Sequence, residues 1–198
     1  MTRRITTALA DGTPILLRPL TLADETHLRD GIARLSDQSR YLRFFTAARH
    51  VPDAVIRRLC NADGHLNVSW GAIAGRGPQA QPVGAAHVLR TRETEEPELA
   101  FAVLDAWHAK GLARMMIAAV LIDCAADGMT QVKADVLVEN ANARALLTHL
   151  GGTIRAMEDG VATYAISINT ALERLATAKR PAGLADVFRG PDRSDRAA

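Results

Sequence analysis

The sequence predicts a single domain of mixed α/β class, and three observations support this prediction. A chain of 198 residues, of which 48% are hydrophobic, can bury one substantial core. Apolar runs typical of strands alternate with helical patterns along its length. One continuous apolar run, Leu99–Leu104, leads through a short glycine-containing loop into a helical pattern that extends to about Ala126. We expect the domain to span residues 1–178, and residues 179–198 to form a flexible tail.

The first half of the chain is expected to form a strand, three helices and two further strands. Thr21 is a typical N-cap, because its hydroxyl can accept a hydrogen bond from the first helical turn, where Asp24 suits the helix dipole. That helix is expected to end near Leu35. The other segments are a strand at Thr13–Arg18, helices at Ser36–Phe45 and Pro52–Cys60, and strands at Leu66–Ala74 and Val83–Arg90, which are followed by a charged connection at Thr91–Pro97.

The second half continues from the long helix, which Asp127 and Gly128 are expected to end. Residues Gln131–Val138 alternate apolar and other side chains, as in a strand with one buried face. A helix at Asn142–Leu150 follows, and then strands at Thr153–Met157 and Val161–Ile168 that flank a hairpin turn.

The loop His108–Ala113 has the character of an anion site. A strand that turns through a glycine into a helix leaves backbone N–H groups unpaired at the positive end of the helix dipole, which suits a phosphate. Gly111 and Ala113 let that backbone approach an anion closely, and Lys110 adds a cation. The loop alone therefore indicates a nucleotide-type ligand.

Charge argues against a nucleic-acid partner. The chain carries 24 basic and 22 acidic residues, a net charge of +2. Residues 179–198 hold five basic and three acidic residues, which is also +2, so the rest of the chain is neutral. A nucleic-acid protein would carry its basic patch on the folded part.

Three features predict a cytoplasmic protein. No apolar run approaches the roughly 18 residues of a membrane span. The apolar stretch at the N-terminus is too short and polar for a secretion signal. Cys60 and Cys124 lack metal-type spacing and are expected to be reduced and buried, so we expect no bound metal.

Three motifs in register resemble the GNAT superfamily of acyl-CoA-dependent N-acetyltransferases. The family's pyrophosphate loop, Gln/Arg-x-x-Gly-x-Gly/Ala, matches His108–Ala113 except for its first residue. A strand that ends at Asn140, followed by a helix that ends at Leu150-Gly151, matches the family's next motif. The opening segment ILLRPLTLADETHL is also similar, and the resemblance covers residues 13 to 168.

The resemblance implies a fold and a cosubstrate. The GNAT fold is a mostly antiparallel, twisted sheet of about seven strands flanked by helices, with a V-shaped splay between its fourth and fifth strands. Acetyl-CoA would pair its pantetheine arm with the fourth strand around Val103. Its pyrophosphate would lie on the loop, on Lys110, Gly111, Leu112, Ala113 and Arg114.

Glu98 is the predicted general base, because an ammonium must lose a proton before it can attack a thioester. It begins the fourth strand of that arrangement and matches the Glu that several lysine acetyltransferases of the superfamily use. Apolar neighbours are expected to raise its pKa toward neutrality. The alternative is a charge at the strand edge that faces solvent.

Other positions allow two interpretations. His108 either contacts the phosphates or contributes its backbone alone, and the second is favoured. Asn140 either contacts the cofactor or caps the following helix. Many relatives place a Tyr that protonates the leaving thiolate at the position of Leu147, so the general acid is left open.

The segment Leu35–Phe45 resembles Leu-Ser-x-x-Ser-x-Tyr-x-Arg-Phe-Phe in GNAT domains related to bacterial protein-lysine acetyltransferases. That segment lies on the acceptor side of the family's cleft. Its aromatic residues are expected to face the core, and its arginines to be solvated or to bind an acidic acceptor. These residues are Tyr41, Phe44, Phe45, Arg40 and Arg43.

The resemblance thus predicts an acetyl-CoA-dependent N-acetyltransferase whose favoured acceptor is a protein lysine. A small amine is the alternative acceptor, and a silent acyl-CoA-binding domain is the alternative of a different class. Neither a nucleic acid nor a membrane is expected as a partner, and both monomer and homodimer are left open.

Overall fold

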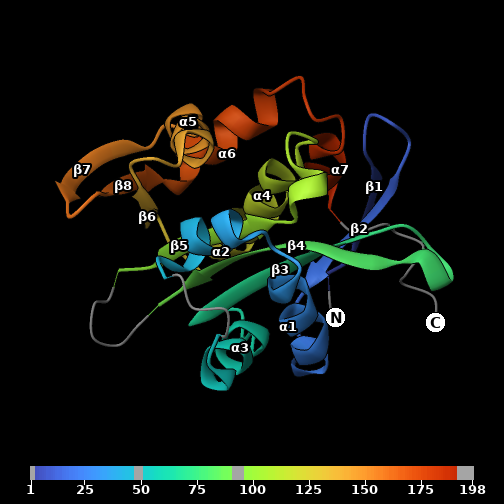
Figure 1. Ribbon diagram of the computed structural model, residues 1–198. Helices are drawn as coiled ribbons and strands as arrows, with labels where there is room; N and C mark the ends of the chain where they lie inside the picture. The colour runs from blue at the N-terminus through green and yellow to red at the C-terminus, as the bar shows by residue number, and fades with distance from the viewer. Residues whose placement is uncertain (1–2, 47–50, 91–95, 191–198) are drawn as a thin grey trace.

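The computed structural model describes residues 3–46, 51–90 and 96–190, and these form a sheet flanked by helices on both faces (Figure 1). In this described part of the chain the sheet has eight strands in the order β1-β2-β3-β4-β5-β6-β8-β7. Neighbouring strands are antiparallel except β5 and β6, which are parallel. The predicted class and the predicted, mostly antiparallel sheet are confirmed, with one strand more than expected.

The strands are β1 Ile5–Ala8, β2 Pro14–Pro19, β3 Asn67–Ala74, β4 Gln81–Leu89, β5 Glu98–Val103, β6 Gln131–Leu137, β7 Thr153–Glu158 and β8 Val161–Ser167. The α-helices are α1 Glu25–Ala33, α2 Asp37–Phe44, α3 Asp53–Cys60, α4 Leu112–Ala126, α5 Ala141–His149, α6 Ile168–Thr177 and α7 Leu184–Arg189. Short 3-10 helices are η1 Leu22–Asp24, η2 Gly77–Gln79 and η3 Asp105–Trp107. Each predicted strand and helix is present within a few residues of its expected bounds.

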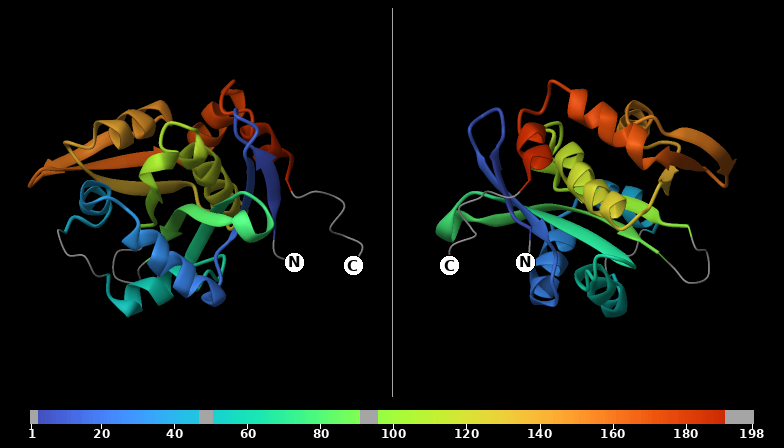
Figure 2. Two further views of the ribbon diagram at one scale, coloured as in Figure 1. Left: turned by 45° about the vertical axis from the view of Figure 1, so that its right-hand side comes forward. Right: turned by 180° about the vertical axis from the view of Figure 1, so that it is seen from behind.

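Helix α4 is the centre of the core. It packs against β3, β4 and β5 on one side and against α6 and α7 on the other, while α1 and α3 cover the opposite face of the sheet (Figure 2). Because it is covered on nearly all sides, its residues from Met115 to Leu121 are fully buried. Burial of this amount of apolar surface is the main stabilising term of the domain.

Three segments, β1, α6 and α7, were not predicted. Strand β1 pairs with β2 across a turn at Asp11 and Gly12, where Gly12 has a φ of +81°. Helix α7 lies beside β1 and packs on α4, with Leu184 and Val187 buried. The expectation of a flexible tail is therefore wrong for residues 184–189, because these two apolar side chains complete the cover of α4. Residues 191–198 of that tail, and 91–95 of the predicted charged connection, lie outside the described residues.

Two further sequence observations can be compared with the structure. Cys60 and Cys124 are free and buried, as expected. Within the described residues, no helix is long and apolar enough to cross a membrane.

The entry to α1 is fixed by a buried ion pair. Arg18 Nη2 lies 2.6 Å from Asp24 Oδ1, and Arg18 Nη1 lies 2.7 Å from Oδ2. The same carboxylate accepts from the N–H and hydroxyl of Thr21, which completes the predicted cap. The hydrogen bonds from Arg18 lower the pKa of Asp24 to about 2, although partial burial acts in the opposite direction.

We predict that this pair stabilises the fold in a pH-dependent manner. The pKa of Asp24 is lower in the folded than in the unfolded chain, so its stabilisation is present above about pH 4 and is lost as pH falls toward about 2. At neutral pH, Asp24→Asn should lower the unfolding free energy by about 2–4 kcal/mol, because the Arg18 cation loses its partner. Urea unfolding at a series of pH values measures this difference.

The control is Asp30→Asn on the exposed face of the same helix, which should change stability by less than about 0.5 kcal/mol. The difference in unfolding free energy between wild type and Asp24→Asn should become smaller as pH falls and Asp24 is protonated. A difference that stays constant down to pH 2 would contradict this role of the ion pair.

Candidate active site

The candidate site is a fork between β5 and β6. These strands pair at one position, Glu98 with Lys133, and no further pairing joins them among the described residues. The carbonyl of Pro97 accepts from Lys133 N on the β6 side, whereas Leu104 N donates to Val83 on the β4 side. Strand alternation therefore turns the backbone N–H groups of Leu99, Phe101 and Val103 toward the gap. An extended ligand could pair with this edge as a strand would.

The loop between β5 and α4 follows the end of β5 that is separated from β6, which is the open end of the fork; the closed end is the pair of Glu98 with Lys133. Gly111 has a φ of +86° and is the N-cap of α4. Ala109 is also left-handed, with a φ of +59°, which is uncommon for a residue with a side chain. The first-turn N–H groups of Leu112, Ala113 and Arg114 have no acceptor within the helix, as at any helix start. The predicted glycine turn into the helix is thus present.

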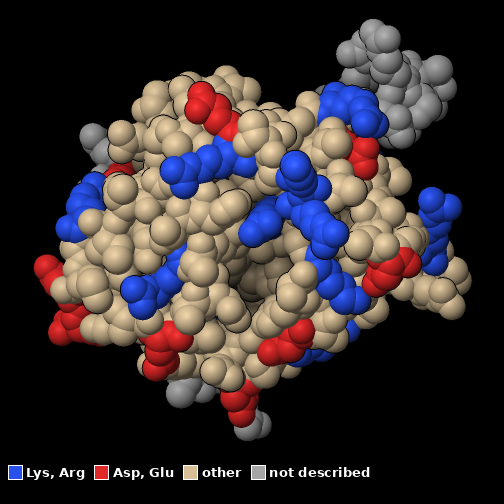
Figure 3. Space-filling view, turned by 90° about the horizontal axis from the view of Figure 1, so that it is seen from above, with Lys and Arg blue, Asp and Glu red and all other residues tan. Residues whose placement is uncertain are grey.

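Cations surround this loop. Lys110 Nζ lies 3.4 Å from the Asp11 carboxylate and 4.9 Å from the centre of the Trp107 ring. Arg114 Nη1 donates to the carbonyl of Arg180, at 3.2 Å. Figure 3, a view from above, shows Lys and Arg side chains gathered around a hollow in the surface, with Asp and Glu side chains on its lower rim. This face is electrostatically suited to a polyanion.

His108 and Asn140 both have structural partners. His108 Nε2 lies 2.8 Å from the carbonyl oxygen of Val103, so the imidazole closes the end of β5. Asn140 Oδ1 accepts from Ala143 N at 3.1 Å and caps α5, which is one of its two predicted roles. Leu147, at the position where relatives carry a Tyr, is fully buried.

Glu98 lies at the closed end of the fork in a charged environment. Its carboxylate is 3.4 Å from Lys133 Nζ, and its side chain is 47% exposed. Lys133 Nζ also lies 2.9 Å from Asp135 Oδ2. The apolar surroundings expected for Glu98 are therefore absent, because the facing strand β6 supplies a cation and a second carboxylate.

Helix α2 crosses the fork, in contact with both β5 and β6. Its N-terminus is held by Asp105, which accepts from the hydroxyls of Ser36 and Ser39 at 2.7 and 2.8 Å. Partial burial acts to raise the pKa of Asp105, but these hydrogen bonds lower it to about 2. The two serines of the α2 motif thus tie the start of α2 to η3, at the beginning of the loop between β5 and α4.

The other end of α2 is fixed by Arg43, which is partly buried. Arg43 Nη2 lies 2.8 Å from His87 Nε2 on β4. Burial, and then the charges of Arg43 and Arg58, keep the pKa of His87 well below its usual range. The imidazole is therefore neutral and accepts the hydrogen bond from the guanidinium. Burial lowers the pKa of Arg43 to about 10, opposed by the charge of Glu98.

The side chains of α2 are arranged largely opposite to expectation. Arg40, expected in solvent, is 5% exposed, because it binds Asp37 and the carbonyl of Leu35. Tyr41 and Phe45, expected in the core, are 39% and 41% exposed. Phe44 packs against the small cluster of Ile32, Val51 and Ile56, as expected.

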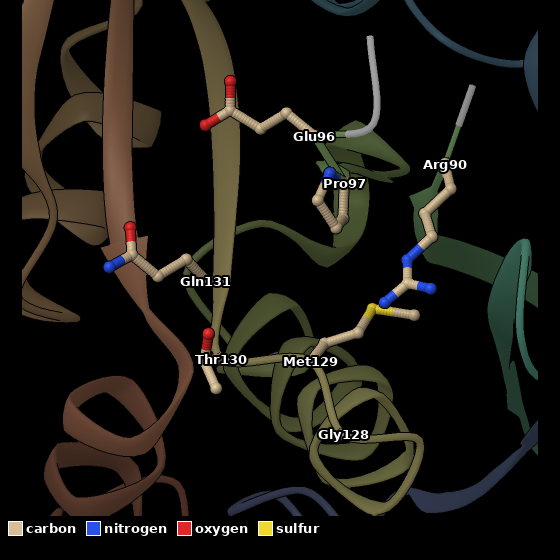
Figure 4. A pocket seen from close by; sticks show the side chains of 7 residues that line it. All are labelled: Arg90, Glu96, Pro97, Gly128, Met129, Thr130 and Gln131. Atoms are coloured by element: carbon tan, nitrogen blue, oxygen red, sulfur yellow. The ribbon is translucent and has the colours of Figure 1, made fainter. Parts of the chain in front are cut away.

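Two hollows lie near the sheet, and neither is lined by Glu98 or by residues 108–114, although the first is lined by Val103. One, of about 270 Å³, lies between α1 and strands β3 to β5. The other, of about 420 Å³, is an open hollow at the ends of β4, β5 and α4 (Figure 4). Figure 4 shows Arg90 and Met129 pointing toward one another there, and Glu96 and Gln131 pointing away. Neither hollow is lined by Glu98 and Lys133 or by the cations Lys110 and Arg114 of the fork.

Comparison with known proteins places this geometry in context. The profile of a family described as the Acetyltransferase (GNAT) domain matches residues 15–153. The chain is 24% identical over 144 residues to Acetyltransferase PA5475 of Pseudomonas aeruginosa, which covers 73% of this chain and 77% of the relative.

Solved structures share the fold. The GNAT domain of S. lividans PAT superposes with a TM-score of 0.73 at 24% identity, over 83% of this chain and 96% of that one. Spermidine N-acetyltransferase from Vibrio cholerae, in complex with CoA and spermine, has a TM-score of 0.60 at 16% identity, over 80% of this chain and 98% of that one.

Gly111 provides a direct test of the loop geometry. A Cβ at this position would require a left-handed alanine and would lie 2.5 Å from Cγ of Pro181. We expect Gly111→Ala to lower the unfolding free energy by about 2–4 kcal/mol, measured by urea or thermal unfolding. Gly128→Ala, at a φ of +81° with nothing within 4 Å, is the matched control and should cost about 1 kcal/mol. Equal losses in the two variants would contradict the packing of Pro181 on the loop.

Proposed function

Because the chain belongs to the GNAT family of acetyltransferases, we propose that it transfers an acetyl group from acetyl-CoA to a primary amine. The chain is an acyltransferase, because the model of this family matches residues 15–153, which is more than half of its length. The observation that supports the proposed cosubstrate most directly is the fork with a cationic loop at its open end. The unpaired edge of β5 can form hydrogen bonds with an extended thiol arm, and the N–H groups at the start of α4 can bind a diphosphate.

Each end of the fork has a proposed role. The open end binds phosphate through the backbone from Lys110 to Arg114, with the Lys110 and Arg114 cations beside it. The pantetheine arm lies along β5 and pairs with backbone groups at Val103. His108 holds the Val103 carbonyl, and Asn140 caps α5. The thioester then lies toward the closed end, where Glu98 begins β5.

Glu98 is proposed as the general base. The acceptor arrives as an ammonium and gives a proton to the Glu98 carboxylate, directly or through water. The neutral amine then attacks the thioester carbonyl carbon, and the C–S bond breaks to release CoA as a thiolate. Buried Leu147 supplies no acid, and none is required, because a thiol of pKa near 8.5 leaves readily and can take its proton from water.

A protein lysine is the proposed acceptor. Two aromatic side chains are exposed here: Tyr41 on α2, and Phe45, the left-handed residue that follows the end of the helix. Exposed aromatic side chains beside a reaction site suit a protein surface better than a small polar amine. The structural neighbour named PAT is consistent with this choice, whereas the spermidine acetyltransferase represents the alternative acceptor.

Replacement of Glu98 by Gln tests the proposed function. We expect kcat/KM toward a lysine-bearing acceptor to fall at least about 100-fold, because the amine loses its base. The affinity for acetyl-CoA should stay within about threefold, since phosphate and pantetheine contacts lie elsewhere on the fork. Steady-state release of CoA, with calorimetry for affinity, measures both quantities.

The matched control is Glu96→Gln, two residues away, whose carboxylate is held by Arg155 at 2.8 Å. It should retain turnover within about threefold. An unchanged rate in Glu98→Gln would remove Glu98 as the base. Binding of acetyl-CoA without turnover on any lysine peptide, polyamine or amino acid would instead favour a silent acyl-CoA-binding domain.

A further inference from the structure

Lys133 occupies the position in which an acceptor amine would meet the proposed base. Its Cα is paired with that of Glu98 at the closed end of the fork. Its Nζ lies 3.4 Å from the Glu98 carboxylate and 2.9 Å from that of Asp135. The chain's own lysine is thus held between two carboxylates, as an incoming ammonium would be.

The orientation of Lys133 follows from strand geometry. Val132, Ala134 and Val136 of β6 are buried in the core that contains α4, so Lys133 and Asp135 point to the opposite face. Glu98 faces the same way, because on β5 it is Leu99 that packs into that core. Helix α2 crosses this face and brings Arg43 near Glu98. The Lys133 ammonium therefore lies on the same face of the sheet as Glu98 and α2.

Lysine is scarce in this chain. Of its 24 basic residues only three are lysines, namely Lys110, Lys133 and Lys179. Lys110 is at the anion-binding loop, and Lys179 is an exposed residue after α6. Lys133 alone among them contacts Glu98, so a reaction at this site can be assigned without ambiguity.

We propose that Lys133 is a self-acetylation site, at which the chain acetylates its own Nζ with acetyl-CoA. This rests on the proposed function, since it uses the same cosubstrate and the same base. Lys133 gives a proton to Glu98 and attacks the thioester carbonyl carbon. The new N–C bond forms as the C–S bond breaks, and CoA leaves as a thiolate. The products are N-acetyl-Lys133, CoA thiol and one released proton.

The resting state and the product differ in charge. Partial burial lowers the pKa of Lys133, but the hydrogen bond to Asp135 and the charge of Glu98 outweigh this and raise it. At rest the side chain is an ammonium, so the reaction needs the base. Once acetylated, the side chain is neutral and keeps neither ion pair. Self-acetylation therefore frees the Glu98 carboxylate for an external amine.

The experiment incubates the full chain with acetyl-CoA labelled in the acetyl group, without any acceptor, and maps the label by peptide mass spectrometry. We expect one acetyl group per chain, on Lys133, with a rate that does not depend on protein concentration. Lys133→Arg should carry no label there, since arginine keeps the charge but offers no acylatable amine. Glu98→Gln should slow labelling at least about 100-fold. Lys179→Arg is the matched control and should label Lys133 at the wild-type rate.

Two outcomes overturn the proposal. One is label spread evenly over the three lysines, which indicates uncatalysed chemistry. The other is an unlabelled Lys133 in a protein that turns over an external amine, which removes the self-acetylation and leaves the proposed function intact. An unlabelled Lys133 in a protein that neither binds acetyl-CoA nor acetylates any amine removes both.

Discussion

The parallel contact between β5 and β6 is the constraint on which the other features of the site depend. The two strands meet at Glu98 and Lys133 and separate beyond this position, which leaves one edge of β5 without a strand partner in the described chain. An unpaired strand edge inside a sheet is costly unless something completes it. Helix α4 starts at the open end, and α2 crosses the opposite face, so the gap is shaped by elements from both halves of the sheet.

The charges follow from the same arrangement. At the open end the loop presents helix N–H groups and two cations, of which Lys110 is paired with an exposed carboxylate of the β1–β2 turn. At the closed end, strands β5 and β6 bring two carboxylates to one ammonium. The first region is suited to a polyanion and the second to an amine. A cosubstrate with phosphates at one end and a thioester at the other would span both.

Much of this arrangement could be predicted from sequence, because it is encoded locally. The apolar run of β5, the glycine of the loop and the helical pattern of α4 are consecutive in the chain, and they keep this order in space. Gly111 has the left-handed conformation that the loop requires. The short α7 was harder to predict, because it is held by its packing on α4 rather than by its own pattern.

Helix α2 illustrates what sequence alone could not provide. Arginines are normally solvated and aromatics buried, yet Arg40 is buried here and Tyr41 is exposed. Arg43 is held by His87, which is 44 residues away in sequence, and no local pattern indicates that contact. The ammonium between Glu98 and Asp135 likewise depends on the register between two strands that are separated by the whole of α4. Such contacts follow from the fold and not from composition.

The most direct measurement is a calorimetric titration of the purified chain with acetyl-CoA, with CoA and ATP as companion ligands. We expect binding of acetyl-CoA and CoA with affinity on the order of micromolar, and no comparable binding of ATP, which lacks the thiol arm that pairs with β5. Mass spectrometry of the protein as purified checks that no ligand already fills the fork. An empty fork that binds neither acetyl-CoA nor CoA would contradict the account.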